Sequence, residues 1–124
     1  MKVTKISERD VTKKELGSDG SYVKELITRH TTQTKKAMLG VSNFKPRFQS
    51  KVLVHNEDEL AYVLVGSGKL WTPCETISYT VGDALFIPAG TPHKVINDGE
   101  FDLAMVFFFT YPEYPPTEVV DEMI

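Results

Sequence analysis

His93 is the residue of this chain whose sequence context most invites a chemical role. It lies in the stretch GDALFIPAGTPHKVIN, residues 82–97, which joins an apolar run to a Pro-Ala-Gly turn and ends in Asn97. A histidine in such a position can bind a metal ion, or it can merely line the interior of a fold. Metal binding requires further donor side chains, and these must come from other parts of the chain.

Short strand-like segments recur about every ten residues and are separated by Gly-, Pro- and Asp-containing turns. No long stretch has the 3.6-residue periodicity of a helix. This pattern predicts an all-β sandwich or barrel, forming a single domain. We expect an N-terminal arm over residues 1–20, a barrel over 22–110 and a proline-rich C-terminal arm over 111–124, extended and with room for a short final helix. The expected strands are 22–30, 36–44, 49–55, 60–65, 69–72, 75–80, 84–88, 93–97 and 101–109.

The composition excludes several classes of function. Fourteen basic and 17 acidic residues give a net charge of −3, so the chain has no excess of basic residues for binding nucleic acid. The longest apolar run, residues 103–109, is too short to cross a membrane. The N-terminus lacks the apolar core of a secretory signal, and Cys74 is the only cysteine. We therefore expect a cytoplasmic protein without disulfides.

Residues 82–97 match a family motif at every fixed position. The pattern is Gly, five residues, Pro-x-Gly, two residues, His, three residues, Asn, and it is met by Gly82, Pro88, Gly90, His93 and Asn97. On this ground the chain resembles the cupins, whose fold is a double-stranded β-helix, a jelly-roll-like barrel of two packed antiparallel sheets. The resemblance covers residues 22–110.

The first motif of the cupins is matched in part. His55 fits its second histidine, Glu59 its carboxylate and Gly66 its closing glycine. Arg47 stands where the family has a glycine, and Leu53 stands where it has the first histidine. The 15 residues between the motifs, 67–81, resemble the spacing of the shortest, microbial cupins.

The resemblance implies a divalent-metal site of three residues: His55, Glu59 and His93. In the family three histidines and one glutamate bind iron, manganese, nickel or zinc. Two imidazoles and one carboxylate also resemble the facial triad of non-haem iron enzymes, which leaves coordination positions open. The alternative is a metal-free pocket in which both histidines are polar lining residues, as in cupins that have lost their metal.

Alternation along a strand places Gln49, Lys51, Leu53 and His55 on one face, so the first three are candidate substrate-binding residues. Lys51 is either a clamp for an anionic group or an amine that reaches the barrel mouth, and the second interpretation is preferred. For four further residues, structural roles are favoured over chemical ones: Cys74, Trp71, Tyr62 and His30.

Two classes of function remain open. The first is a metal-dependent enzyme of the dioxygenase, isomerase, decarboxylase or lyase type, acting on a small organic acid or a sugar-like substrate. The second is a metal-free binding or sensor protein. The catalytic residues stay unassigned. A homodimer is expected because a small barrel has sheet edges to cover, with the segments at residues 2–7 and 111–124 as candidates for pairing.

Overall fold

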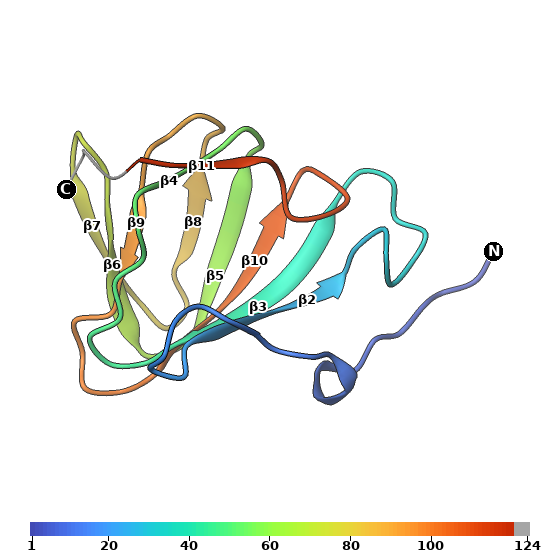
Figure 1. Cartoon of the computed structure of the whole chain (residues 1–124), viewed down its shortest axis with the longest axis horizontal. Helices are drawn as coiled ribbons and strands as arrows, with labels where there is room; N and C mark the ends of the chain where they lie inside the picture. The colour runs from blue at the N-terminus through green and yellow to red at the C-terminus, as the bar shows by residue number, and fades with distance from the viewer. Residues whose placement is uncertain (121–124) are drawn as a thin grey trace.

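The computed structural model describes residues 1–120, and these form β-strands with a single short 3-10 helix, η1 (Glu8–Asp10) (Figure 1). The strands are β1 (Lys14–Glu15), β2 (Tyr22–Ile27), β3 (Met38–Phe44), β4 (Leu53–His55), β5 (Glu59–Val65), β6 (Ser67–Trp71), β7 (Thr76–Thr80), β8 (Ala84–Ile87), β9 (Lys94–Ile96), β10 (Leu103–Phe109) and β11 (Thr117–Val119). The all-β prediction is confirmed.

Two antiparallel layers enclose the interior. One is a six-stranded sheet with the order β1-β2-β3-β10-β5-β8. The other consists of the sheet β7-β6-β9 and the pair β11-β4. Isolated bridges from Leu53 to His93 and from Gln49 to Ile96 join these two smaller sheets. This joining matters for the site, because it brings the strand of His55 beside the segment that carries His93.

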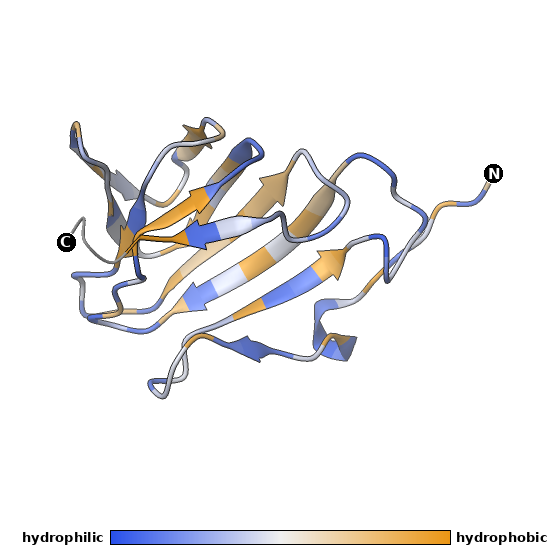
Figure 2. Ribbon diagram, turned by 45° about the horizontal axis from the view of Figure 1, so that its top comes forward, coloured by the Kyte–Doolittle hydropathy of each residue, from blue (hydrophilic) through white to orange (hydrophobic). Residues whose placement is uncertain are grey.

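Alternating burial defines the interior of the large sheet. In both β3 and β10 every second residue is buried, from Met38 to Phe44 and from Leu103 to Phe109. Figure 2 shows hydrophobic residues along much of this sheet, whereas the loops are mainly hydrophilic. The β10 residues between the buried ones, such as Val106 and Phe108, lie on the opposite face of the sheet and are only partly buried.

The Pro-Ala-Gly turn fastens the two motif segments to each other. The amide of Gly90 donates to the carbonyl of His55 at 2.8 Å, and the amide of Ala89 donates to Asp58 Oδ1 at 2.9 Å. Gly90 has a φ of +83°, a conformation that glycine adopts without steric cost. The turn therefore holds the loop before His93 against the end of β4.

Arg47 explains one departure from the first cupin motif. It occupies the position of the motif glycine and has a φ of +71°, in the left-handed region that glycine favours. Its amide donates to the carbonyl of Asn97 at 2.8 Å. Asn97 is fully buried, and its side-chain amide donates to the carbonyls of Phe44 and Phe101. The backbone shape of the motif is thus kept although the glycine is not.

The two arms differ from the expected ones. Lys14 and Glu15, within the expected N-terminal arm, form a strand on β2. Residues 117–119 form β11 on β4, so this part of the C-terminal arm joins a sheet instead of leaving it; residues 121–124, where a short final helix had room, lie outside the described residues. The expected strand 49–55 is regular only at Leu53–His55. Within residues 1–120 no helix has the length and hydropathy that a membrane crossing requires.

Candidate metal centre and cavity

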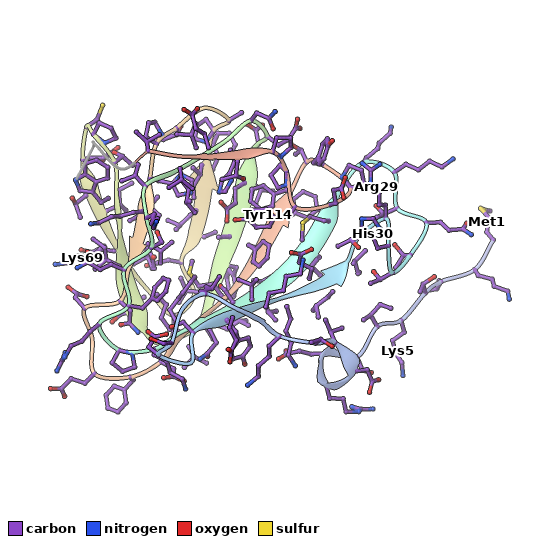
Figure 3. The ribbon with its side chains drawn as sticks, in the orientation of Figure 1. Met1, Lys5, Arg29, His30, Lys69 and Tyr114 are labelled. Atoms are coloured by element: carbon purple, nitrogen blue, oxygen red, sulfur yellow. The ribbon has the colours of Figure 1, made fainter. Side chains whose placement is uncertain are left out.

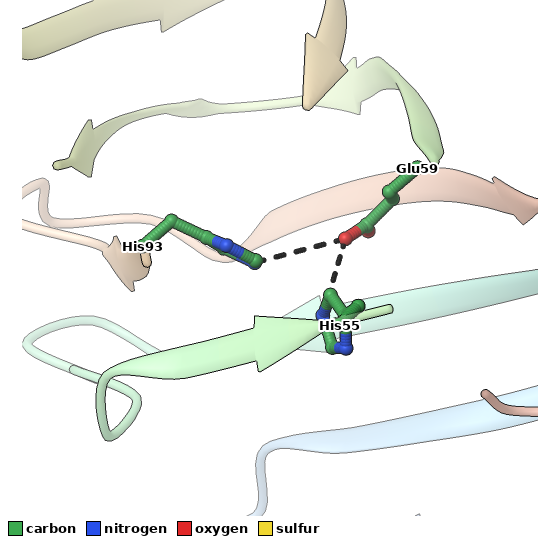
Figure 4. Close-up of side chains that lie close together, drawn as sticks. All are labelled: His55, Glu59 and His93. Carbon is green, nitrogen blue, oxygen red and sulfur yellow. Dashed lines mark ion pairs between the residues drawn. The ribbon is translucent and has the colours of Figure 1, made fainter. Parts of the chain in front are cut away.

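The three residues of the expected site lie together in the interior (Figure 4). His55 is the last residue of β4, Glu59 is the first of β5, and His93 directly precedes β9. Leu53 and His93 exchange two backbone hydrogen bonds, of 2.8 and 3.0 Å. Glu59 lies near His55 because only a short turn separates β4 from β5. The pairing of Leu53 with His93 places His93 beside both.

The donor atoms converge on a common point. Nε2 of His55 lies 3.4 Å from Oε1 of Glu59, and Nε2 of His93 lies 3.7 Å from the same oxygen. All three donor atoms lie within 4.8 Å of one another. Donors bound at about 2.0–2.2 Å to one cation are roughly 3–3.5 Å apart at tetrahedral or octahedral angles. The site therefore fits a divalent ion after a small inward movement of the histidine pair.

Hydrogen bonds at the far side of each ring leave both Nε2 atoms free to act as donors to a metal. His93 Nδ1 lies 2.8 Å from the carbonyl of Thr91, which can only accept, so Nδ1 carries the proton. His55 Nδ1 lies 2.7 Å from the Thr117 hydroxyl, and that hydroxyl donates its own proton to the carbonyl of Pro115 at 2.9 Å. Such outer contacts fix the tautomer and orientation of metal-binding histidines.

Burial keeps the three groups neutral when no cation is present. It lowers the pKa of His55 to about 4, with the nearby His93 as the second cause. The pKa of His93 is lowered as well, mainly by burial. Burial raises the pKa of Glu59 to about 8. The contacts drawn dashed in Figure 4 therefore join groups that are mainly neutral at pH 7, although their geometry suits ion pairs.

A cavity of about 370 Å³ opens beside the three residues. The candidate substrate-binding residues Gln49, Lys51 and Leu53 all line it, and Ser50 lines it as well, because residues 49–52 do not form the regular strand expected there. Lys51 is exposed, which agrees with an amine at the mouth of the barrel. Most of the remaining wall is hydrophobic or aromatic, from Phe44, Phe48, Ala61, Leu70, Leu85, Ile87, Val95, Met105, Phe107 and Phe109.

Tyr114 and Thr117 are site residues that the sequence reasoning missed. Tyr114 reaches inward from the C-terminal segment and packs edge-on against His55, with ring centroids 5.7 Å apart (Figure 3). Burial and the nearby Glu59 raise the pKa of its phenol, and the hydroxyl is protonated at pH 7 as in other tyrosines. The clue available in the sequence was a group of three β-branched residues, Thr117, Val119 and Val120, directly after the prolines.

The other candidates lie away from the cavity. Cys74 is exposed. His30 is exposed and contacts Glu113 at 2.9 Å. Tyr62 is 47% exposed on the outer face of the large sheet, and Trp71 is partly buried in β6. None of these four lines the cavity formed by the described residues.

Comparison with known proteins gives relatives of several kinds. An uncharacterized protein of Methanocaldococcus jannaschii is 31% identical over 126 residues, which cover 98% of both chains. A 1-hydroxy-2-naphthoate 1,2-dioxygenase of a Nocardioides species is 31% identical over 67 residues, which cover 54% of this chain but only 17% of the dioxygenase.

Solved structures share the fold at lower identity. The polyketide cyclase RemF of Streptomyces resistomycificus superimposes with a TM-score of 0.80 at 23% identity, over 96% of this chain and 86% of the cyclase. A predicted oxalate decarboxylase of Thermotoga maritima superimposes with a TM-score of 0.73 at 18% identity, over 87% of this chain and 99% of the other. The family model of the cupin domain matches residues 40–109. With both motif segments, the barrel and this match in agreement, the chain belongs to the cupin family.

Proposed function

We propose that this protein is a metal-dependent enzyme in which His55, Glu59 and His93 bind a divalent cation. The observation that carries the proposal is the orientation of the two imidazoles. Each Nδ1 is held by an acceptor, and each Nε2 points at the Glu59 carboxylate. Three donor atoms that converge on one point, with both Nε2 atoms free of protons, are what a divalent cation requires.

Three ligands leave coordination positions open for a substrate. A bound cation would act there as a Lewis acid on a substrate oxygen, and iron, manganese, nickel and zinc all suit the donor set. The protein's own groups bind and shield the substrate: the hydrophobic wall excludes water, and the phenol of Tyr114, beside His55, donates a hydrogen bond to a substrate oxygen. The relatives that are enzymes, a dioxygenase and a polyketide cyclase, support the enzyme class.

The alternative function is that of a metal-free binding protein. Leu53, on the cavity wall where the family has a fourth ligand, favours it. A hydrophobic cavity next to two neutral histidines would still hold a small organic molecule.

Elemental analysis of protein purified without added metal tests the proposal. We expect close to one equivalent of a divalent metal in the unmodified protein and a loss of at least about tenfold in His93→Ala, because one of three ligands is removed. His30→Ala is the matched control, since His30 is an exposed histidine outside the cavity, and it should keep its metal. The proposal fails if the protein takes up no iron, manganese, nickel or zinc, even after dialysis at pH 8.

A further inference from the structure

The cavity has few charged groups with which to hold a small anion or a sugar. Among the described residues that line it, Lys51 is the one cationic side chain, and it lies exposed at the mouth. The proposed cation would bind the oxygens at one end of a small dianion, but apart from Lys51 the described cavity wall offers the other end no charge-assisted partner. Such a molecule would also leave most of the hydrophobic wall in contact with water.

Two of the polar lining side chains, Tyr79 and Ser50, are already engaged in hydrogen bonds within the protein. The Tyr79 hydroxyl donates to the carbonyl of Lys69 at 3.3 Å. The Ser50 hydroxyl donates to the carbonyl of Lys51 at 2.8 Å and accepts from the amide of Val95 at 2.9 Å. A sugar carries hydroxyls all around its ring, and most of these would face the hydrophobic wall rather than the remaining polar side chains, Ser42, Gln49 and Tyr114. The cavity therefore argues against the sugar-like and small dicarboxylic substrates that the sequence left open.

Strand register places the hydrophobic space directly beside the metal ligands. Glu59 and Ala61 face inward from β5, two residues apart, which corresponds to about 7 Å along a strand. Opposite them on β10 are Phe109 and Phe107, respectively. The ring of Phe107 lies over Gly40 of β3, where an added Cβ would come within 2.4 Å of the ring. The Phe107 ring thus occupies the space over Gly40, and the small side chain of Ala61 leaves the space next to Glu59 open.

We infer that the substrate is a molecule of one or two fused aromatic rings that carries its metal-binding oxygens at one end; this rests on the proposed metal site. The oxygens would face His55 and His93, and the rings would lie over Ala61. Aromatic edges and faces are available on both sides, from the Phe44–Phe48 stack, with ring centroids 5.0 Å apart, and from Phe107. A volume of about 370 Å³ is at the lower end of the range for small-molecule sites.

Calorimetric titration of zinc-loaded protein with 1-hydroxy-2-naphthoate and with oxalate tests this inference. Zinc is used because it undergoes no redox chemistry. We expect the naphthoate to bind at least about tenfold more tightly than oxalate, because only the naphthoate covers the hydrophobic wall. Ala61→Leu should weaken naphthoate binding by at least about tenfold while the zinc content stays the same. Ala84→Leu adds the same atoms to the outer face of the sheet and should change neither.

Each outcome decides the question. Oxalate binding as tight as that of the naphthoate, or unchanged naphthoate binding in Ala61→Leu, overturns the inference. If Ala61→Leu does not fold, Ser42→Leu fills the cavity from the neighbouring part of the wall and takes its place. Protein that holds zinc but not the naphthoate refutes this inference alone. Protein that holds the naphthoate but never a metal refutes the proposed function, and the aromatic preference of the cavity stands.

Discussion

At the scale of single residues, Leu53 sets the composition of the candidate metal centre. Its backbone pairs with that of His93, and its side chain lines the cavity two residues before His55. A side chain at this position is therefore close to the expected cation, and a leucine there contributes only hydrophobic surface. The remaining three donors leave more of the coordination sphere open than the four-ligand site of the family does.

Leu53→His is expected to raise the affinity for a divalent cation by about tenfold or more, because it adds an imidazole on the same face as His55. Competition titration against a chromophoric chelator measures the change. Leu85→His is the control, since Leu85 lines the cavity opposite Ala61 rather than beside the three ligands, and it should have little effect. Equal affinity in Leu53→His and the unmodified protein would show that position 53 cannot reach the cation.

The three residues of the candidate site could be predicted because their spacing in the sequence resembles that of the cupin motifs. His55 and Glu59 are separated by one turn, and the position of His93 follows from the Pro-Ala-Gly turn. Thr117 could not be predicted, because a single threonine hydroxyl 62 residues away from its partner has no spacing rule. The left-handed backbone conformation of Arg47 could not be predicted from the sequence either, because residues other than glycine rarely adopt it.

At the scale of elements, β11 is the strand that supports the metal centre from outside the two motifs. It pairs with β4, and the residue opposite His55 is Thr117. The same C-terminal segment contributes Tyr114 to the cavity, and its Glu113 contacts Arg29 and His30 beyond the end of β2. A segment expected to leave the sheet thus closes one side of the site. The prolines at 112, 115 and 116 predicted an arm outside the sheets, but the three residues after them pair with β4 as a strand.

Thr117→Val should lower metal affinity by about tenfold to a hundredfold, because the Nδ1–H of His55 loses its acceptor while the shape of the side chain is nearly kept. Thr117→Ser retains the hydroxyl and should restore most of the affinity. Chelator competition gives the affinities, and thermal melting of the metal-free variants checks that the fold is intact. Identical affinities in the valine and serine variants would remove Thr117 from the site.

At the scale of the whole molecule, the outer face of the large sheet is unusually hydrophobic. On four adjacent strands, the side chains of this outer face that point away from the cavity include seven large hydrophobic ones: Leu39, Val41, Leu60, Tyr62, Phe86, Val106 and Phe108. Leu60 and Phe86 are cross-strand partners and are 43% and 62% exposed. Contiguous hydrophobic surface of this kind marks association sites in soluble proteins.

We expect a homodimer formed through the outer face, with the two copies related by a two-fold axis. The sequence suggested a dimer formed by the two chain ends instead. In the structure β11 pairs with β4 of its own chain, and residues 1–7 extend away from the barrel without joining a sheet (Figure 1). Phe86→Glu should weaken dimerisation by at least about tenfold, since it places a charge in the patch. Light scattering over a concentration series measures this.

Phe101→Glu is the control for dimerisation, because Phe101 is 78% exposed but lies in the turn after β9, away from the outer face. It should leave the oligomeric state unchanged. A protein that scatters as a monomer at micromolar concentration, without any substitution, would contradict the expected dimer.

The placement of Glu59 and Ala61 two residues apart on β5 has an evolutionary consequence. Glu59 is the proposed ligand, and Ala61, its neighbour on the same face, controls how much room lies beside it. Replacing Ala61 with a larger residue would change which compounds fit the cavity and would leave the three proposed metal-binding side chains unchanged. Substitutions at position 61 alone could therefore change substrate specificity, in related proteins or in a mutant library, while the proposed metal site stays the same.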